Sequence, residues 1–149
     1  MDRLILDLDL NKCCACGACA IACMDQNDID TAAETPLIYV FTAENAEKET
    51  VRYFSLACMH CNDAPCVMAC PIGCFSQDET TGLTVYDNEN CIGCHACSLA
   101  CPYGAVSYTA EGKMQKCDGC AERVHHGLVP ACVRICTVNA LSLAVKRVP

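Results

Sequence analysis

Large aromatic side chains are scarce in this 149-residue chain, which has no tryptophan and only three phenylalanines. Hydrophobic residues make up 53% of the sequence, but 18 of them are cysteines. An ordinary domain of this length has more large side chains to pack its core. A core of small residues around cysteines therefore indicates an interior that is filled by something inorganic.

Long apolar runs are also absent. No stretch approaches the roughly 18 residues that a membrane-spanning helix needs, and Asp7 and Asp9 interrupt the apolar residues near the start. A lone Arg3 does not make a twin-arginine export signal. We therefore expect a soluble, cytoplasmic protein with no membrane span, in a compartment where thiols bind metal and do not form disulfides.

Positive charge is sparse as well, because 10 Lys and Arg residues stand against 18 Asp and Glu, for a net charge of −8. Such a surface repels phosphates, and the sequence has no basic cluster, so we expect no nucleic-acid partner. It also shows no nucleophile–base pair, phosphate-binding glycine loop or dinucleotide fingerprint. We therefore expect no substrate site, and no enzyme activity of this polypeptide alone.

Cysteine is the residue that the sequence has in abundance, and sixteen of the eighteen fall into four groups of four. Each group contains two or more cysteines three positions apart, and each ends in a pair four positions apart. The groups are Cys13-x2-Cys16-x2-Cys19-x3-Cys23; Cys58-x2-Cys61-x4-Cys66-x3-Cys70; Cys91-x2-Cys94-x2-Cys97-x3-Cys101; and Cys117-x2-Cys120-x11-Cys132-x3-Cys136.

The third group, with Pro102 after it, matches the bacterial ferredoxin run C-x2-C-x2-C-x3-C-P in full. A tight loop with cysteines three apart can reach three irons of a cubane, while its backbone N–H groups point at the sulfurs. A zinc ion favours two C-x2-C pairs, which leaves zinc and disulfides as minor alternatives. The pattern predicts four [4Fe–4S] clusters, with each of the sixteen grouped cysteines as an iron ligand.

Other residues in these runs have competing interpretations. Cys14 and Cys74 are left over, and we expect both to be small buried hydrophobes, with a redox or substitute-ligand role as the alternative. His60 and His95 either donate a hydrogen bond to a cluster or are loop residues that face solvent or a partner. Lys116 either offsets cluster charge or is simply solvated.

Short apolar segments between the cysteine runs predict strands, so the runs and strands together form an internal repeat. A polar segment, 45–49, is expected to be an exposed turn. The length suggests one domain, 1–149. The expected strands cover residues 4–10, 37–41, 51–56, 83–86, 105–108 and 141–145.

From about residue 12 to residue 145, the chain resembles the four-cluster ferredoxin-type subunits of molybdenum- and tungsten-pterin oxidoreductases. Formate dehydrogenases, polysulfide and dimethyl sulfoxide reductases, formate-linked hydrogenase complexes and some tungsten aldehyde oxidoreductases carry such subunits. The most specific pieces are the second cysteine run, 58–66, the Lys-Cys-Asp-Gly-Cys segment, 116–120, and the segment 127–132. The split fourth group is particularly specific, because simple ferredoxins lack it.

The resemblance implies an α+β fold of two nested bacterial ferredoxin-like modules, with short antiparallel strands and short helices. The outer module would span about 1–57 plus 110–149, and the inner module about 58–109. The family also implies that, within each module, the two cysteine groups exchange their last cysteines. The four ligand sets would be Cys58, Cys61, Cys66 and Cys101; Cys91, Cys94, Cys97 and Cys70; Cys13, Cys16, Cys19 and Cys136; and Cys117, Cys120, Cys132 and Cys23.

The chain departs from the family pattern in the outer module. Met24 follows Cys23, and Thr137-Val138-Asn139 follows Cys136, where a proline would be usual. All sixteen cysteines are present, so we still expect four cubane clusters.

The resemblance implies an electron-conducting subunit between a Mo/W-pterin catalytic subunit, of aldehyde oxidoreductase or formate dehydrogenase type, and a second redox subunit of flavin, hydrogenase or ferredoxin type. Two other functions stay open. One is a free-standing polyferredoxin that carries electrons between enzymes, and the other is a zinc-storing protein without redox work. Clusters near both ends would also let copies of the chain stack into filaments.

Overall fold

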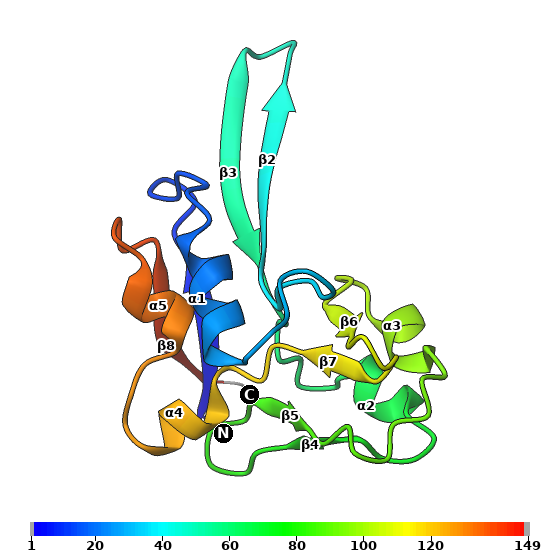
Figure 1. Ribbon diagram of the computed structural model, residues 1–149. Helices are drawn as coiled ribbons and strands as arrows, with labels where there is room; N and C mark the ends of the chain where they lie inside the picture. Colours follow the sequence, from blue (N-terminus) through cyan, green and yellow to red (C-terminus); the bar gives the residue numbers. More distant parts are fainter. Residues whose placement is uncertain (1, 148–149) are drawn as a thin grey trace.

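A computed structural model describes residues 2–147, which form short helices and two-stranded antiparallel sheets (Figure 1). Helix α1 has nine residues, and helices α2 to α5 have five residues each. The expectation of short helices with short antiparallel strands is confirmed. Within residues 2–147, no helix combines the length and the apolar character that crossing a bilayer requires.

The two ends of the chain pair with each other. Strand β1 (Asp2–Leu8) lies antiparallel to strand β8 (Leu141–Arg147). Apolar residues face one another directly across the ladder, where Leu6 opposes Leu143 and Leu8 opposes Leu141. Such cross-strand apolar pairs stabilise a two-stranded ladder that has few other neighbours. Both strands were expected from the sequence, and their ends differ from the expected ones by a few residues.

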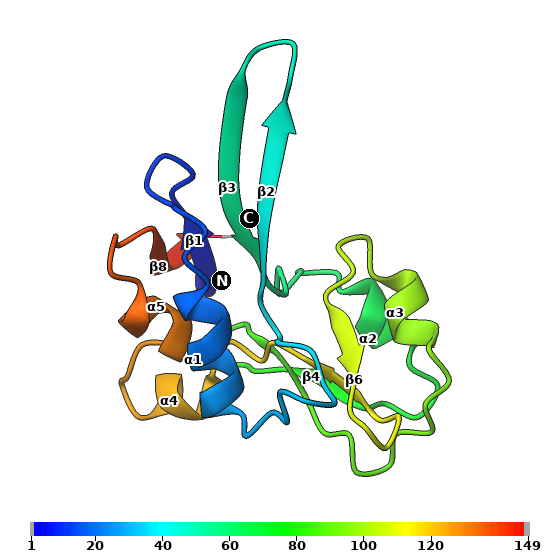
Figure 2. The ribbon, with the colours of Figure 1, turned by 45° about the horizontal axis from the view of Figure 1, so that its top comes forward.

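Three helices lie beside this ladder on the left of both views (Figures 1 and 2). Helix α1 (Ala18–Gln26) packs against helix α5 (Ala131–Ile135), and α4 (Ala121–His125) precedes α5. The core beneath them is assembled from both ends of the chain, with cysteines among its apolar residues. Its buried members are Cys23, Met24, Ile29, Leu37, Ile38, Cys117, Cys132 and Leu141.

The middle of the sequence forms a second core, on the right of both views (Figures 1 and 2). Helix α2 (Pro65–Ala69) packs against helix α3 (Ala96–Ala100). Two hairpins accompany them: β4 (Phe75–Gln77) pairs with β5 (Thr84–Tyr86), and β6 (Val106–Tyr108) pairs with β7 (Met114–Lys116). The buried members of this core are Ala64, Cys66, Cys74, Phe75, Cys97, Val106 and Met114.

A long hairpin projects away from both cores (Figure 1). It consists of β2 (Tyr39–Asn45) and β3 (Thr50–Leu56), joined by the exposed turn that the sequence predicted at 45–49. The strands are partly buried where they leave the body and exposed towards the turn. Phe41 and Phe54 stack across the ladder with ring centroids 5.2 Å apart, which gives this exposed ladder an apolar side.

The same tight turn follows the last cysteine of three groups. Three residues after the cysteine, the backbone takes a positive φ, and its N–H donates to the carbonyl oxygen of that cysteine. Glycine adopts such a φ without strain, and asparagine tolerates it better than most residues. The outer module therefore makes this turn without the proline usual in the family. The positive-φ residues are Gly73, Gly104 and Asn139, at 69°, 62° and 49°.

The turn after Cys136 can be tested at Asn139, whose side chain is exposed. We expect Asn139→Gly to leave the free energy of unfolding nearly unchanged. Asn139→Val should lower it by about 1–2 kcal/mol, because a β-branched residue is strained at positive φ. Anaerobic urea denaturation of the two variants measures the difference. Equal stabilities would show that the turn does not depend on residue 139.

Candidate metal centres

The cysteines that the sequence grouped lie around four separate places in the structure. Three sets of four each line a small cavity, with about 360, 330 and 290 Å³ of empty space. Each cavity joins the early cysteines of one group to the last cysteine of another. In the order of those volumes, the sets are Cys13, Cys16, Cys19 and Cys136; Cys117, Cys120, Cys132 and Cys23; and Cys91, Cys94, Cys97 and Cys70.

The remaining four cysteines are linked by their electrostatic effects on one another. Cys58 and Cys101 both raise the pKa of the Cys61 thiol, after the larger effect of burial. They act on Cys66 in the same way, again after burial. Repulsion of this kind requires the sulfurs to be close. All sixteen grouped cysteines are thus brought together in the sets that the family pairing implies, while their role as iron ligands stays a prediction.

The arrangement differs from a site for a single ion. Within residues 2–147, no three His, Cys, Asp or Glu side chains form a group that could hold one metal ion. Instead, the sulfurs surround an empty space in three of the sets. All eighteen cysteines are free thiols. A soft, all-sulfur donor set around a cavity fits a cluster whose irons lie at separate corners.

Backbone N–H groups point at these sulfurs in a repeating pattern. The first cysteine of three groups accepts a hydrogen bond from the residue two positions later, over 3.3–3.5 Å. The last cysteine of three groups accepts one from the residue four positions later, over 3.2–3.5 Å. The partial positive charge on each N–H stabilises a thiolate. The first cysteines that accept such a bond are Cys58, Cys91 and Cys117, and the last cysteines are Cys70, Cys101 and Cys136.

Cys23 receives its hydrogen bond from a side chain instead. Asn27 lies four positions later, and its Nδ2 is 3.6 Å from Cys23 Sγ. The same amide donates to the carbonyl oxygen of Cys23 over 2.7 Å. Asn27 was not predicted from the sequence, although its position relative to the last cysteine is the one that supplies the backbone donor in the other groups.

Several of these thiols are deeply buried, which opposes their ionisation. Burial, with repulsion from neighbouring cysteines, raises the pKa of Cys132 to about 12. Burial also raises the pKa of Cys23 to about 11 and that of Cys117 well above its ordinary value. Without a metal these groups stay protonated at neutral pH, whereas a coordinated cation deprotonates a thiol. The buried sets therefore suit metal binding and not free thiolate chemistry.

The two ungrouped cysteines have different environments. Cys74 is buried, as expected, and it lines the same cavity as Cys70 and Cys91. Burial and hydrogen bonds to these two sulfurs raise the pKa of Cys74 to about 11, which keeps it a thiol and a donor. Cys14 is exposed, so the expectation that it is buried is wrong. Cys14 also lines the cavity of Cys13, Cys16, Cys19 and Cys136, so it borders both that site and solvent.

Two cations are buried between the cores. Lys116 is fully buried, and its Nζ donates to the carbonyl oxygens of Thr84 and of Cys117, the latter over 2.8 Å. Arg3, which is 5% exposed, donates to the carbonyl oxygens of His60 and Gly82 and, over 2.8 Å, to Asn62 Oδ1. The expectation of ordinary solvation for Lys116 is wrong, and no role for Arg3 in this region was predicted from the sequence.

These buried cations bear on the fit of a cluster. The acceptors that hold Lys116 and Arg3 are neutral amide oxygens. A buried charge is costly unless an opposite charge is near. Neighbouring anionic clusters with thiolate ligands would supply that opposite charge. The donor set, the cavities and the buried cations therefore all fit [4Fe–4S] groups.

The two histidines of the cysteine runs lie in contrasting places. His95 is exposed, precedes α3 and stacks on Tyr108 with ring centroids 4.0 Å apart. His60 is 4% exposed, so the interpretation of a solvent-facing loop residue is wrong for it. Burial, followed by the charges of Lys116 and Arg3, lowers the pKa of His60 to about 3, so that its ring is neutral.

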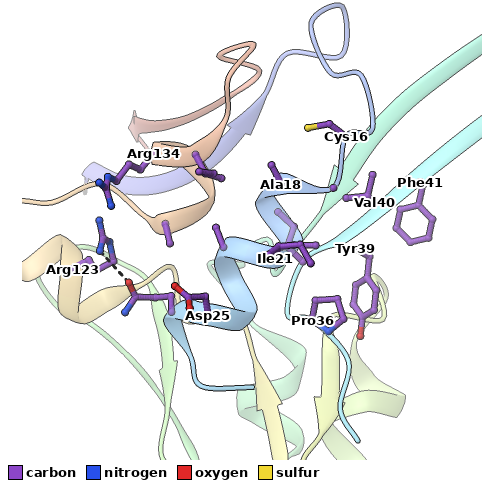
Figure 3. A pocket seen from close by; sticks show the side chains of 17 residues that line it. Cys16, Ala18, Ile21, Asp25, Pro36, Tyr39, Val40, Phe41, Arg123 and Arg134 are labelled. Carbon is purple, nitrogen blue, oxygen red and sulfur yellow. Dashed lines mark hydrogen bonds between the residues drawn. The ribbon is translucent and has the colours of Figure 1, made fainter. Parts of the chain in front are cut away.

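A large hollow of the surface lies between α1, α5 and the base of the hairpin (Figure 3). Ile21 and Phe41 give it apolar walls, and Cys16 lies at one end. At the opposite side, Arg123 donates to Gln26 Oε1 over 3.0 Å. The hollow therefore combines apolar surface with access to the first cysteine loop.

Comparison with known proteins finds relatives over most of the chain. A family model described as a 4Fe-4S dicluster domain matches residues 49–146. The B subunit of anaerobic dimethyl sulfoxide reductase from Escherichia coli (strain K12) is 36% identical over 143 residues, covering 90% of this chain and 69% of the relative. The formate dehydrogenase iron-sulfur subunit of Wolinella succinogenes is 31% identical over 156 residues, covering 89% and 76%. The arsenate respiratory reductase iron-sulfur subunit of Shewanella sp. (strain ANA-3) is 36% identical over 127 residues, covering 85% and 54%.

The buried ammonium of Lys116 can be tested by Lys116→Met, which keeps much of the length and removes the charge. In the metal-loaded protein we expect the free energy of unfolding to fall by at least about 1–3 kcal/mol, because the Thr84 and Cys117 carbonyls lose their donor. Lys113→Met is the control, because Lys113 Nζ donates to Glu89 O in an exposed hydrogen bond. Anaerobic denaturation, followed by visible absorption, measures both. Equal stability of the Lys116→Met and Lys113→Met proteins would contradict the inference that a buried anion lies near Lys116.

Proposed function

The protein belongs to the family of 4Fe-4S dicluster-domain proteins, and on that premise we propose that it holds four [4Fe–4S] clusters on sixteen of its eighteen cysteines and relays electrons within an oxidoreductase complex. The resemblance to iron-sulfur subunits of molybdopterin oxidoreductases is confirmed by its relatives. These relatives are electron-transfer subunits, not catalytic ones. The expectation that the chain is not itself an enzyme is likewise confirmed.

The observation that carries the proposal is the gathering of cysteines into four sets. In three of them, four sulfurs that belong to distant parts of the sequence line one cavity. The fourth set is supported by the mutual electrostatic effects of Cys58, Cys61, Cys66 and Cys101. We assign one cluster to each set, with the last cysteines exchanged between groups as the family implies.

We further propose that the four sites form two nested modules. The two separate cores support this division, because one draws on both ends of the chain and the other on its middle. We place the end of the inner module slightly later than the predicted boundary at 109/110. Strand β7 pairs with β6, and Met114 packs in the second core, so the inner module extends to about Lys116.

A bound [4Fe–4S] cluster accepts and releases one electron without a change in its ligands. The chain's own residues hold each cluster in a fixed place, exclude water from its buried side and adjust its charge. The N–H donors at the sulfurs and the ammonium of Lys116 oppose the negative charge that accumulates on reduction. The protein thus positions and tunes the redox groups, and it makes or breaks no bond in a substrate.

For the partners, we propose a Mo/W-pterin catalytic subunit at one end of the relay and a second redox subunit at the other. The relatives support a catalytic partner, because they are named as subunits of dimethyl sulfoxide, formate and arsenate enzymes. An aldehyde oxidoreductase or formate dehydrogenase type of catalytic subunit, a cytoplasmic location and filament stacking stay predictions from the sequence. The alternative is a free-standing electron carrier, and purification from native cells distinguishes it from a subunit of a complex.

Metal analysis tests the number of clusters and their ligands. We expect anaerobically purified protein to contain about sixteen irons and as many sulfides per chain, four of each for every cluster. Cys132→Ala should lose between one and four irons, because it removes one predicted ligand. Cys14→Ala and Cys74→Ala should keep the full content and serve as matched controls. A colourless protein that holds zinc would refute the cluster assignment.

Purification from native cells tests the partner. We expect the chain to co-purify with a larger subunit in a fixed ratio, and the sample to contain molybdenum or tungsten. Elemental analysis and subunit separation of the same sample measure both. A full iron content in a chain that purifies alone, at all salt concentrations tried, would instead favour the free-standing carrier.

A further inference from the structure

The second and fourth cysteine groups meet at the first core. Cys58, from the second group, packs against the first core, whose buried members include Cys117 from the fourth group. The charge of Cys58 is also among those that raise the pKa of Cys117, after the larger effect of burial. Under the proposed assignment, these two cysteines ligate different clusters, one in each module.

His60 spans the gap between these two cysteines. Its backbone N–H donates to Cys58 Sγ over 3.4 Å. Its ring atom Nε2 lies 3.9 Å from Cys117 Sγ, on the other side. One residue is therefore within hydrogen-bonding distance of a sulfur in each module.

The structure determines which ring nitrogen carries the proton. The Thr84 N–H donates to His60 Nδ1 over 3.0 Å, so Nδ1 is an acceptor. A neutral imidazole then carries its hydrogen on Nε2, the atom that faces Cys117. The contact with Cys117 is therefore an N–H···S hydrogen bond in which the histidine donates.

The ring is held in this orientation from several sides. His60 is 4% exposed, and its backbone has a φ of 45°. Its carbonyl oxygen accepts from Arg3 Nη2 over 3.0 Å. Lys116, which binds the carbonyl oxygen of Thr84, fixes the strand residue that in turn donates to the ring. A side chain with so many constraints is pre-organised as a donor.

We propose that His60 is the positioning residue that links the two modules: it donates Nε2–H to Cys117 while its backbone donates to Cys58, and so tunes and couples the two clusters between which electrons cross from one module to the other. This inference rests on the proposed function, because it requires Cys58 and Cys117 to ligate different clusters. One electron moves across the link, no bond forms or breaks, and the imidazole keeps its Nε2 proton throughout.

The hydrogen bond has a definite effect on the Cys117 site. A donor at a ligand sulfur stabilises the additional negative charge of the reduced state, so it raises the reduction potential. The charge of His60 does not change, since Nδ1 is occupied by the Thr84 N–H. Removal of the Nε2–H donor should therefore shift the reduction potential of one cluster to a more negative value. The potentials of the other clusters should stay unchanged.

Two substitutions separate this role from a structural one. His60→Asn suits the positive φ and keeps an acceptor near the position of Nδ1 for the Thr84 N–H, but it does not reach Cys117. His60→Gln is longer and can return an amide donor to the Cys117 side. His126→Asn is the control, because His126 is exposed and lines none of the three cysteine cavities.

The experiment uses the full, anaerobically purified chain. Iron and sulfide are determined first, and the cluster potentials are then measured by redox titration followed by electron paramagnetic resonance. With the iron content retained, we expect one cluster potential to shift negative in His60→Asn and to recover at least partly in His60→Gln. All cluster potentials should stay unchanged in His126→Asn. Unchanged potentials in a fully loaded His60→Asn chain would overturn the proposal. A wild-type chain without about sixteen irons would instead overturn the proposed function.

A second measurement covers the case in which His60→Asn loses clusters. The His95→Asn chain is labelled with histidine that carries ¹⁵N in the imidazole ring only, and pulsed electron paramagnetic resonance of the partly reduced protein detects ring nitrogen next to a cluster spin. The backbone N–H of His60, which donates to Cys58, then contributes no ¹⁵N signal. We expect a ¹⁵N coupling, which His60 supplies through its contact with Cys117. Absence of any histidine coupling in this loaded chain would overturn the proposal, whatever the stability of the His60 variants.

Discussion

Concentration of negative charge in a small interior is the constraint on which the rest of this structure depends. The chain already carries a net charge of −8, and each oxidised cluster with four thiolates adds about −2. Charge of this kind is tolerated inside a protein only when dipoles and cations face it. The turns after the last cysteines supply N–H dipoles, and Arg3 and Lys116 supply the buried cations. The irregular backbone is thus the part of the molecule that makes metal binding possible.

The same constraint accounts for the size of the elements. Four of the five helices in residues 2–147 have only five residues, and such segments are not stable in isolation. Both cores contain cysteines among small apolar side chains. Clusters that fill the spaces between these sulfurs would replace the large side chains that the sequence lacks. We therefore expect folding and metal loading to be coupled, as in other small metal-dependent domains.

Much of this organisation was accessible from the sequence, because it depends on local spacing. The four cysteine groups, the strands at both ends and the turn at 45–49 follow from short-range patterns. Strands β4 and β7 were missed because each has only one apolar residue among its three. Asn139 was treated as a departure from the family, whereas its φ of 49° lets it replace the glycine of the equivalent turns.

The burial of particular polar residues could not be predicted from the sequence. His60 and Lys116 lie beside cysteines in segments that are typical of exposed loops, and Arg3 lies near the start of the sequence with no cysteine near it. Their environment is created by contacts between residues 24 to 79 positions apart, such as His60 with Thr84 and Arg3 with Gly82. Only tertiary structure brings such distant residues together. Cys14 shows the converse, since it was expected to be buried and is exposed, although it lines the same cavity as its neighbours.

The pairing of β1 with β8 has a consequence for how the protein matures during synthesis. The sulfurs of the inner sets all lie between residues 58 and 101, so they are complete before the C-terminal third leaves the ribosome. Cys13, Cys16 and Cys19 share their cavity with Cys136, and strand β1 has no partner until β8 has been made. Iron delivery should then follow an order in time, in which the middle of the chain is loaded first and the two ends close last.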